Sequence, residues 1–201
     1  MNSTGLEALA PFVAVAYTMW ATPGPNNLML AYSGARFGVR RTLPHILGVL
    51  TGTVLLNSAG IVVLAPIIER WPAALLMVKV VGTVWLLRIG VRMARSTIAD
   101  GPRDEEQPMS FASAALFQFA NPKAITAASA LASLVLAAAS EDRWLLPAAL
   151  LLIPALCILA NGPWAVAGHA IRRSLTVPWR WRLFTWGTGG LTAGCAIFLW
   201  I

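Results

Sequence analysis

Long apolar segments separated by short polar ones dominate this chain of 201 residues. Six of the segments are long enough for a helix to cross a hydrocarbon core of about 30 Å, which takes about 20 residues. They are Leu9–Ala35, Leu43–Ile68, Pro72–Met93, Phe111–Ala139, Leu145–Ala170 and Leu183–Ile201. Composition agrees, because 58% of the residues are hydrophobic and 11% are charged. The pattern predicts an all-α membrane protein with six transmembrane helices.

Proline interrupts the first and the fourth segments near their middle, within Pro23-Gly24-Pro25 and Asn121-Pro122-Lys123. A proline inside a helix removes a hydrogen-bond donor and clashes with the preceding turn, at a cost of about 3 kcal/mol. In a bilayer, each backbone group freed in this way needs a partner from the protein or from water. A single proline is more often a kink, but one break in each half of the chain is typical of a transporter's substrate site. We therefore predict that helices 1 and 4 are broken and line a cavity.

Arginine is concentrated in alternate connections between the segments. One set of three connections carries ten arginines and the alternate set carries two. The ten are Arg36, Arg40, Arg41, Arg92, Arg95, Arg103, Arg172, Arg173, Arg180 and Arg182, and the two are Arg70 and Arg143. The positive-inside rule then places the arginine-rich connections in the cytoplasm and both termini outside.

An acidic stretch between prolines, Asp104-Glu105-Glu106, separates the chain into two halves. We predict a first three-helix repeat over residues 1–95, a cytoplasmic linker over 96–109 and a second three-helix repeat over 110–201. Because each repeat has an odd number of helices, the second enters the membrane from the opposite side, which makes an inverted repeat. Helices 1 and 4 then bring their breaks to the bilayer midplane from opposite sides.

The chemistry at the two breaks suits a small zwitterion. Each break creates a half-helix whose N-terminus has free N–H groups and the positive end of the helix dipole, and both attract a carboxylate. The side chains beside the breaks are the amides of Asn26, Asn27 and Asn121 and the ammonium group of Lys123.

The same residues resemble a known family of transporters. The run Pro23–Asn27, the pair Gly48 and Gly52, and the run Asn121–Ala124 are similar to those of the lysine exporter (LysE/RhtB) superfamily. Phe117-Gln118-Phe119, Ser110-Phe111 and the run Trp164–His169 look closer to its cysteine and O-acetylserine exporter branch. The resemblance implies amino-acid efflux across the inner membrane of a bacterial cell, driven by a proton or ion gradient. The expected substrate-binding residues are Pro23, Gly24, Pro25, Asn26, Asn27, Gln118, Asn121, Pro122 and Lys123.

Acidic residues are absent from all six predicted spans, although the chain has eight of them. A dibasic substrate would need a negative partner in the membrane, and Thr53 stands where many relatives have an acid, directly after Gly52. We expect a small neutral amino acid, similar to cysteine or O-acetylserine, as the substrate. Homoserine, threonine, leucine and basic amino acids are the alternatives.

Five residues are candidates for coupling or gating. Lys123 is the deepest cation and our candidate proton carrier, whereas His169, like His45, lies near a predicted cytoplasmic helix end, where interfacial packing is the alternative role. Asn57 faces either the cavity or a neighbouring helix. Asn161 and Trp164 flank Gly162-Pro163, a third weak point and a candidate inner gate. Gly48 with Gly52, and Gly190 with Gly194, predict close helix packing.

Other functional classes have less support in the sequence. We predict no enzyme, cofactor or metal site, because Cys157 and Cys195 are isolated, the histidines are far apart and no phosphate-binding glycine loop is present. The positive charges lie at loops and helix ends, which argues for the lipid bilayer rather than nucleic acid as partner. A channel-like protein remains the alternative to an exporter, and the small core is compatible with a homodimer.

Overall fold

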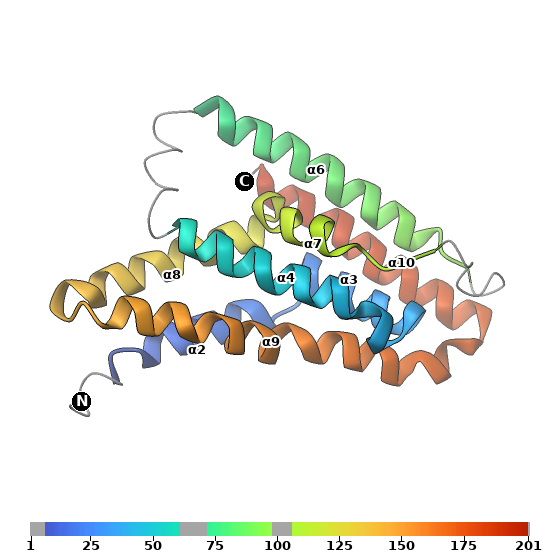
Figure 1. The fold of residues 1–201 in the computed structure, drawn as a ribbon. Helices are drawn as coiled ribbons and strands as arrows, with labels where there is room; N and C mark the ends of the chain where they lie inside the picture. The colour runs from blue at the N-terminus through green and yellow to red at the C-terminus, as the bar shows by residue number, and fades with distance from the viewer. Residues whose placement is uncertain (1–6, 61–71, 98–105, 201) are drawn as a thin grey trace.

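A computed structural model describes residues 7–60, 72–97 and 106–200, and all the regular structure in these ranges is helical (Figure 1). The helices lie roughly along one common direction, as a membrane bundle requires. They are α2 (Ala10–Ala21), α3 (Pro25–Phe37), α4 (Val39–Ala59), α6 (Pro72–Ala94), α7 (Phe111–Phe117), α8 (Pro122–Glu141), α9 (Leu145–Ile171) and α10 (Pro178–Gly194). Short 3-10 helices follow α7, α9 and α10: η2 (Gln118–Ala120), η3 (Arg172–Thr176) and η4 (Cys195–Leu199).

The helices follow the predicted apolar segments, except that two of them begin earlier than predicted. α4 begins at Val39 rather than Leu43, and α10 begins at Pro178 rather than Leu183. The reason is that hydropathy marks the apolar slab, whereas a helix continues beyond it with arginines in its first turns. The predicted end of the second segment, residues 61–68, lies outside the described residues.

Three helical stretches of the described chain are long and apolar enough to cross a membrane by themselves. They are Val39–Ala59, Pro122–Ser140 and Leu145–Thr176. Ala10–Ala21 and Phe111–Ala120 are apolar but shorter. These two short pieces are the first halves of the two segments that proline interrupts, so each reaches its full length only together with the helix that follows it.

Both proline motifs break their helices. α2 ends at Ala21, and α3 begins at Pro25 after Gly24, whose backbone is fully extended. α7 continues into η2, and α8 begins at Pro122 after Asn121. Proline is well suited to the first position of a helix, because the N–H that it lacks would have no partner there. The prolines therefore start new helices rather than kink continuous ones.

Glycine allows α4 to pack closely on α7. A Cβ atom at Gly48 would lie 2.3 Å from the carbonyl oxygen of Phe111, and one at Gly52 would lie 2.4 Å from that of Ala115. The packing predicted for this pair is confirmed, and it holds α7 in place directly before the second break.

The packing predicted for Gly190 and Gly194 is wrong for the part of the chain that the structure describes, because no atom of a neighbouring helix there lies within 4 Å of a Cβ at either position. The contact between α10 and α6 is made one residue earlier, where a Cβ at Gly189 would lie 2.5 Å from the carbonyl oxygen of Gly90. A spacing of four residues gives one face of a helix but does not say which face meets a neighbour.

A candidate substrate site between the two helix breaks

The two breaks meet around a small cavity. Residues from both broken helices line it together with residues of α4 and α9. They are Met19, Trp20, Gly24, Asn26, Asn27, Thr53, Asn57, Gln118, Asn121, Lys123, Ala124 and Asn161. The cavity has a volume of about 20 Å³, which is enough for about one water molecule. The site is therefore closed in this structure.

A pair of amide side chains joins the two breaks directly. Asn26 Nδ2 donates to Gln118 Oε1 over 2.7 Å, and Gln118 Nε2 donates back to Asn26 Oδ1 over 3.1 Å. Gln118 Nε2 also donates to the carbonyl oxygen of Ala114 over 3.0 Å, which fixes the orientation of its fully buried side chain. Asn26 follows the first break and Gln118 precedes the second, so this pair connects the two halves of the chain.

Lys123 also crosses from the second break to the first. Its ammonium group donates to the carbonyl oxygen of Thr22 and, over 3.3 Å, to that of Pro23. The side chain passes over Gly24, where a Cβ atom would lie only 2.6 Å from Lys123 Cδ. A cation in this position stabilises the negative end of the α2 dipole.

Side chains provide donors for the other carbonyl oxygens that the first break releases. Asn27 Nδ2 donates to Trp20 O over 2.8 Å and to Thr22 O over 2.7 Å. Trp164 Nε1, on α9, donates to Ala21 O over 3.1 Å. With Lys123 on the remaining oxygen, every carbonyl from Trp20 to Pro23 has a hydrogen-bond donor. This is the condition under which unwound backbone is tolerated at membrane depth.

Two buried amide oxygens in the cavity have no hydrogen-bond partner among the described residues. They are Oδ1 of Asn27 and Oδ1 of Asn57. The nitrogen of each amide donates to a carbonyl oxygen, that of Asn57 to Thr53 O over 2.8 Å, so the oxygen is the amide atom left without a partner. A buried acceptor without a partner costs about 1–3 kcal/mol, so both are available to a ligand that donates hydrogen bonds.

The described lining of the cavity has one charged side chain, Lys123, and no carboxylate. Its remaining polar side chains are amides, the hydroxyl of Thr53 and the indole of Trp20. The cavity thus offers a cation for the carboxylate and free amide oxygens for the ammonium group of the same small molecule.

The sequence model of the family described as LysE type translocator matches residues 17–201. This chain belongs to the LysE family. It is a multi-pass membrane protein, as its apolar helices and its membership of a family of translocators together indicate. The match spans both breaks and the whole lining of the cavity.

Curated relatives of this LysE-family protein include several named cysteine/O-acetylserine efflux protein. The one from Klebsiella pneumoniae subsp. pneumoniae is 28% identical over 190 residues, which are 94% of this chain and 95% of the relative. Those from Salmonella paratyphi A and Escherichia coli O1:K1 / APEC are 30% and 31% identical over 156 residues, 76% of this chain and 78% and 77% of theirs. No solved structure matches the chain.

Most of the residues predicted for the site lie around the cavity of this LysE-family protein. Asn26, Asn27, Gln118, Asn121 and Lys123 all line it, and so does Gly24. Asn121 has a local role as well, because its Oδ1 accepts from the backbone N–H of Lys123 over 3.2 Å and caps α8. The prolines are not part of the lining. Pro25 and Pro122 begin α3 and α8, and Pro23 is exposed.

The gating candidates divide into three groups. Asn57 and Asn161 line the cavity, which answers the question left open for Asn57. Trp164 does not line the cavity, and its indole N–H caps the first break by donating to Ala21 O. His169 is exposed near the end of α9, where its ring faces Gly38, and the structure does not bring it to the site.

The third weak point predicted at Gly162-Pro163 is not a break. α9 continues without interruption from Leu145 to Ile171 through Pro154 and Pro163. Asn161 Nδ2 donates to Cys157 O over 3.0 Å, one turn back along the same helix. The carbonyl oxygen that Pro163 leaves without its helical donor is that of Leu159, four residues back, and α9 stays helical through this position all the same.

Sequence reasoning missed Thr53, Trp20, Met19 and Ala124 as lining residues. Thr53 had a usable signal, because it lies four residues before Asn57 and therefore on the same face of α4. Trp20 and Met19 had none, since apolar side chains at the end of α2 are no different in sequence from core residues.

Proposed function

We propose that this LysE-family protein is a secondary-active exporter of small neutral amino acids, and that the cavity between the two helix breaks is its substrate site. One observation carries the proposal: among the described residues, the lining combines one cation with two amide oxygens that have no partner, and it contains no carboxylate. The names of the relatives, cysteine/O-acetylserine efflux protein, support a substrate of this class.

The substrate carboxylate binds at Lys123 in this proposal. The ammonium group of Lys123 lies between the two breaks, next to the N-terminus of α8, where the helix dipole also favours an anion. A hydrogen bond to a charged group contributes about 1.5–3 kcal/mol, more than one between neutral groups.

The substrate ammonium group binds at the amide oxygens of Asn27 and Asn57. Both oxygens are buried acceptors without partners among the described residues, and an ammonium group offers three donors. When the carboxylate draws Lys123 away from Thr22 and Pro23, the two carbonyl oxygens become further acceptors for the same ammonium group. The substrate ammonium group thus replaces Lys123 at the first break, while the substrate carboxylate pairs with Lys123.

This exchange also opens the closed site. A cavity of about 20 Å³ is much too small for an amino acid, so the breaks must separate when substrate enters. The Asn26–Gln118 pair and the bonds of Lys123 are the contacts that must be lost, and the proposed contacts of the substrate with Lys123 and with the carbonyl oxygens of Thr22 and Pro23 replace the second set. The gate is therefore coupled to binding by chemistry at the same groups.

We further propose alternating access by two inverted three-helix repeats with six spans. The helix contacts support it: α4, the second helix of the first half, packs on α7, and α9, the second helix of the other half, packs on α2. The third helices of the two halves, α6 and α10, pack on one another. This is the pattern expected when each half repeats the fold of the other.

Orientation and coupling belong to the same proposal. The distribution of arginines places both termini outside the inner membrane. Lys123 is the titratable side chain with an ammonium group in the cavity, so it is our candidate for the proton carrier in gradient-driven export. Dimerisation stays a prediction.

The proposal is tested by efflux from cells preloaded with labelled cysteine, O-acetylserine, threonine, leucine, lysine or arginine, with and without an uncoupler. We expect uncoupler-sensitive export of neutral amino acids. Asn57→Leu, which removes a free oxygen from the cavity, should lower this export by about tenfold or more. Thr192→Val removes a buried hydroxyl that bonds within α10 and does not line the cavity, and it should leave export unchanged. Export of lysine and arginine alone, or equal rates in the two variants, would refute the assignment.

A further inference from the structure

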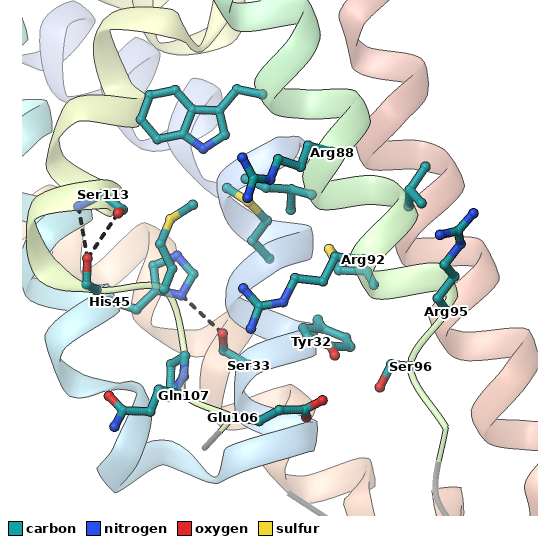
Figure 2. A pocket seen from close by; sticks show the side chains of 18 of the residues that line it. Tyr32, Ser33, His45, Arg88, Arg92, Arg95, Ser96, Glu106, Gln107 and Ser113 are labelled. Atoms are coloured by element: carbon teal, nitrogen blue, oxygen red, sulfur yellow. Dashed lines mark hydrogen bonds between the residues drawn. The ribbon is translucent and has the colours of Figure 1, made fainter. Parts of the chain in front are cut away.

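A second, much larger cavity lies between α3, α4, α6 and the segment that leads into α7 (Figure 2). Its volume is about 1030 Å³, and none of its lining residues lines the cavity between the breaks. An aromatic contact separates the two regions, because Trp85 in the wall of the large cavity packs on Phe117 with ring centroids 5.6 Å apart. The large cavity is therefore a site of its own.

One end of this cavity is strongly positive. Arg88, Arg92 and Arg95 of α6 line it, and Figure 2 shows Arg88 and Arg92 extending from α6 towards α3 and α4. None of the three forms an ion pair with a described residue. The lining carboxylate, Glu106, already forms a salt bridge with Arg36 at 2.9 Å.

A buried imidazole lies in the wall opposite these arginines. His45 is 1% exposed, and its Nδ1 lies 3.1 Å from Ser33 Oγ. Its Nε2 has no partner among the described residues. When the Ser33 hydroxyl donates to Nδ1, Nε2 carries a hydrogen and is a further donor beside the two arginines. Arginine and imidazole donors together suit an anion with several oxygens.

The other end of the cavity is apolar and faces outward. Val80, Val81 and Val84 line it and are among the exposed hydrophobic side chains of α6. Val80 and Arg92 are twelve positions apart, so the apolar and positive ends are separated by about 18 Å along the helix. An occupant must therefore have an anionic head and a long apolar body.

We propose that this cavity binds one anionic phospholipid of the leaflet on the arginine-rich side. The phosphate group lies between Arg88, Arg92 and His45, and an acyl chain follows Val84, Val81 and Val80 towards the bilayer centre. A basic pocket between membrane helices on the cytoplasmic side has the charge and the position that lipid headgroup binding requires. A small amino acid would fill only a fraction of the volume and would leave the apolar wall without contacts.

The test measures quenching of Trp85, which lines the cavity, by brominated phosphatidylglycerol titrated into phosphatidylcholine vesicles that contain the full chain. The contribution of Trp85 is the difference between the wild type and Trp85→Phe. We expect the quenching of Trp85 to saturate at a low fraction of the anionic lipid. Brominated phosphatidylcholine should give no saturable quenching of Trp85, and soluble glycerol phosphate should not compete.

Charge-matched variants locate the headgroup. Arg88→Gln with Arg92→Gln should shift the half-saturation by about 30-fold, since each arginine near the membrane surface contributes about fivefold to the binding of an anionic lipid. Arg173→Gln with Arg180→Gln removes the same charge from exposed positions outside the cavity and should shift it less than threefold. If the first double variant does not assemble, Arg88→Gln and Arg92→Gln singly test the same point at about fivefold each.

Three results would overturn the lipid site. They are equal quenching by the two lipids, equal shifts in the two double variants, and competition by glycerol phosphate. A raised KM for exported amino acid in Arg88→Gln with Arg92→Gln, measured in vesicles of phosphatidylcholine alone, would assign the cavity to substrate entry instead. The lipid measurement needs no transport, so its result does not depend on the proposed export activity.

Discussion

The two helix breaks have the same proline chemistry but are stabilised in different ways. At the second break, the bonds are made within one stretch of chain: η2 continues α7, and Asn121 donates its N–H to Gln118 O over 3.4 Å and caps α8 with its side chain. At the first break, the released carbonyl oxygens accept from Asn27, Lys123 and Trp164, which belong to three different helices.

This difference indicates which break moves. A break that closes its own hydrogen bonds is stable wherever it is placed, whereas one that borrows donors from other helices changes when those helices shift. The first break takes its ammonium donor from α8, beyond the second break, so a ligand that attracts Lys123 acts on both. We infer that the second break is the fixed part of the site and the first is the gate.

The largest effect is expected when the first break loses its cation. Lys123→Ala removes the donor to Thr22 and Pro23 together with the partner of the substrate carboxylate, so export should fall by about 10- to 100-fold. Lys79→Ala is the matched control, because Lys79 lies over the Trp200 ring at 5.9 Å and not in the cavity. Labelled efflux normalised to protein in the membrane measures both, and equal rates in the two variants would contradict the role of Lys123.

A carboxylate placed between the breaks should change the substrate preference. Thr53 lines the cavity, so Thr53→Asp gives a dibasic amino acid the negative partner that the site lacks. We expect the ratio of lysine export to cysteine export to rise by about tenfold, the worth of one charge-assisted hydrogen bond. Thr53→Asn has a similar size without the charge, and a comparable rise in that variant would show that space rather than charge determines the preference.

Removing the cap from α9 should weaken the first break without touching the cavity lining. Trp164→Phe keeps the ring but loses the donor to Ala21 O, which leaves a carbonyl oxygen without a partner at a cost of about 1–3 kcal/mol. Thermal unfolding of the purified protein in detergent should show a lower Tm. An unchanged Tm would mean that water replaces the indole and that the cap contributes little.

The smallest effect is expected at the second break. Asn121→Ala removes the side-chain cap of α8, which typically costs about 1 kcal/mol. The same thermal measurement should place this variant between the wild type and Trp164→Phe. A lower Tm for Asn121→Ala than for Trp164→Phe would reverse our assignment of the second break as the fixed part of the site and the first as the gate.

The breaks themselves were predictable from the sequence because proline acts locally. Pro25 and Pro122 cannot lie inside a helix without cost, and each has polar neighbours that mark the site. Asn26, Asn27, Asn121 and Lys123 therefore reach the cavity as predicted. α4 and α10 begin earlier than predicted, at Val39 and Pro178, because hydropathy marks only the part of a helix that lies in the apolar slab.

The remaining features depend on which helices become neighbours. Trp164 is 143 residues from Ala21 in sequence, and nothing near it indicates that its indole caps α2. For the same reason, Gly162-Pro163 looked like a third break, although α9 remains continuous around it. His169 lies near the end of its helix, as its place in the fifth apolar segment predicts, and it is exposed there and does not line the cavity.

A reversible cross-link between the breaks tests the central claim that the gate must open for export. Asn26→Cys with Gln118→Cys, in a chain with Cys157→Ala and Cys195→Ala, places one thiol on each side of the contact that the amide pair now makes over 2.7 and 3.1 Å. Because cysteine is shorter than asparagine and glutamine, a short bifunctional thiol reagent that a reductant cleaves bridges the two positions. We predict that the bridge stops export, that a reductant restores the rate of the unbridged variant, and that substrate slows formation of the bridge. Export that continues at the unbridged rate in fully cross-linked protein would contradict the account, because the path would not pass between the breaks.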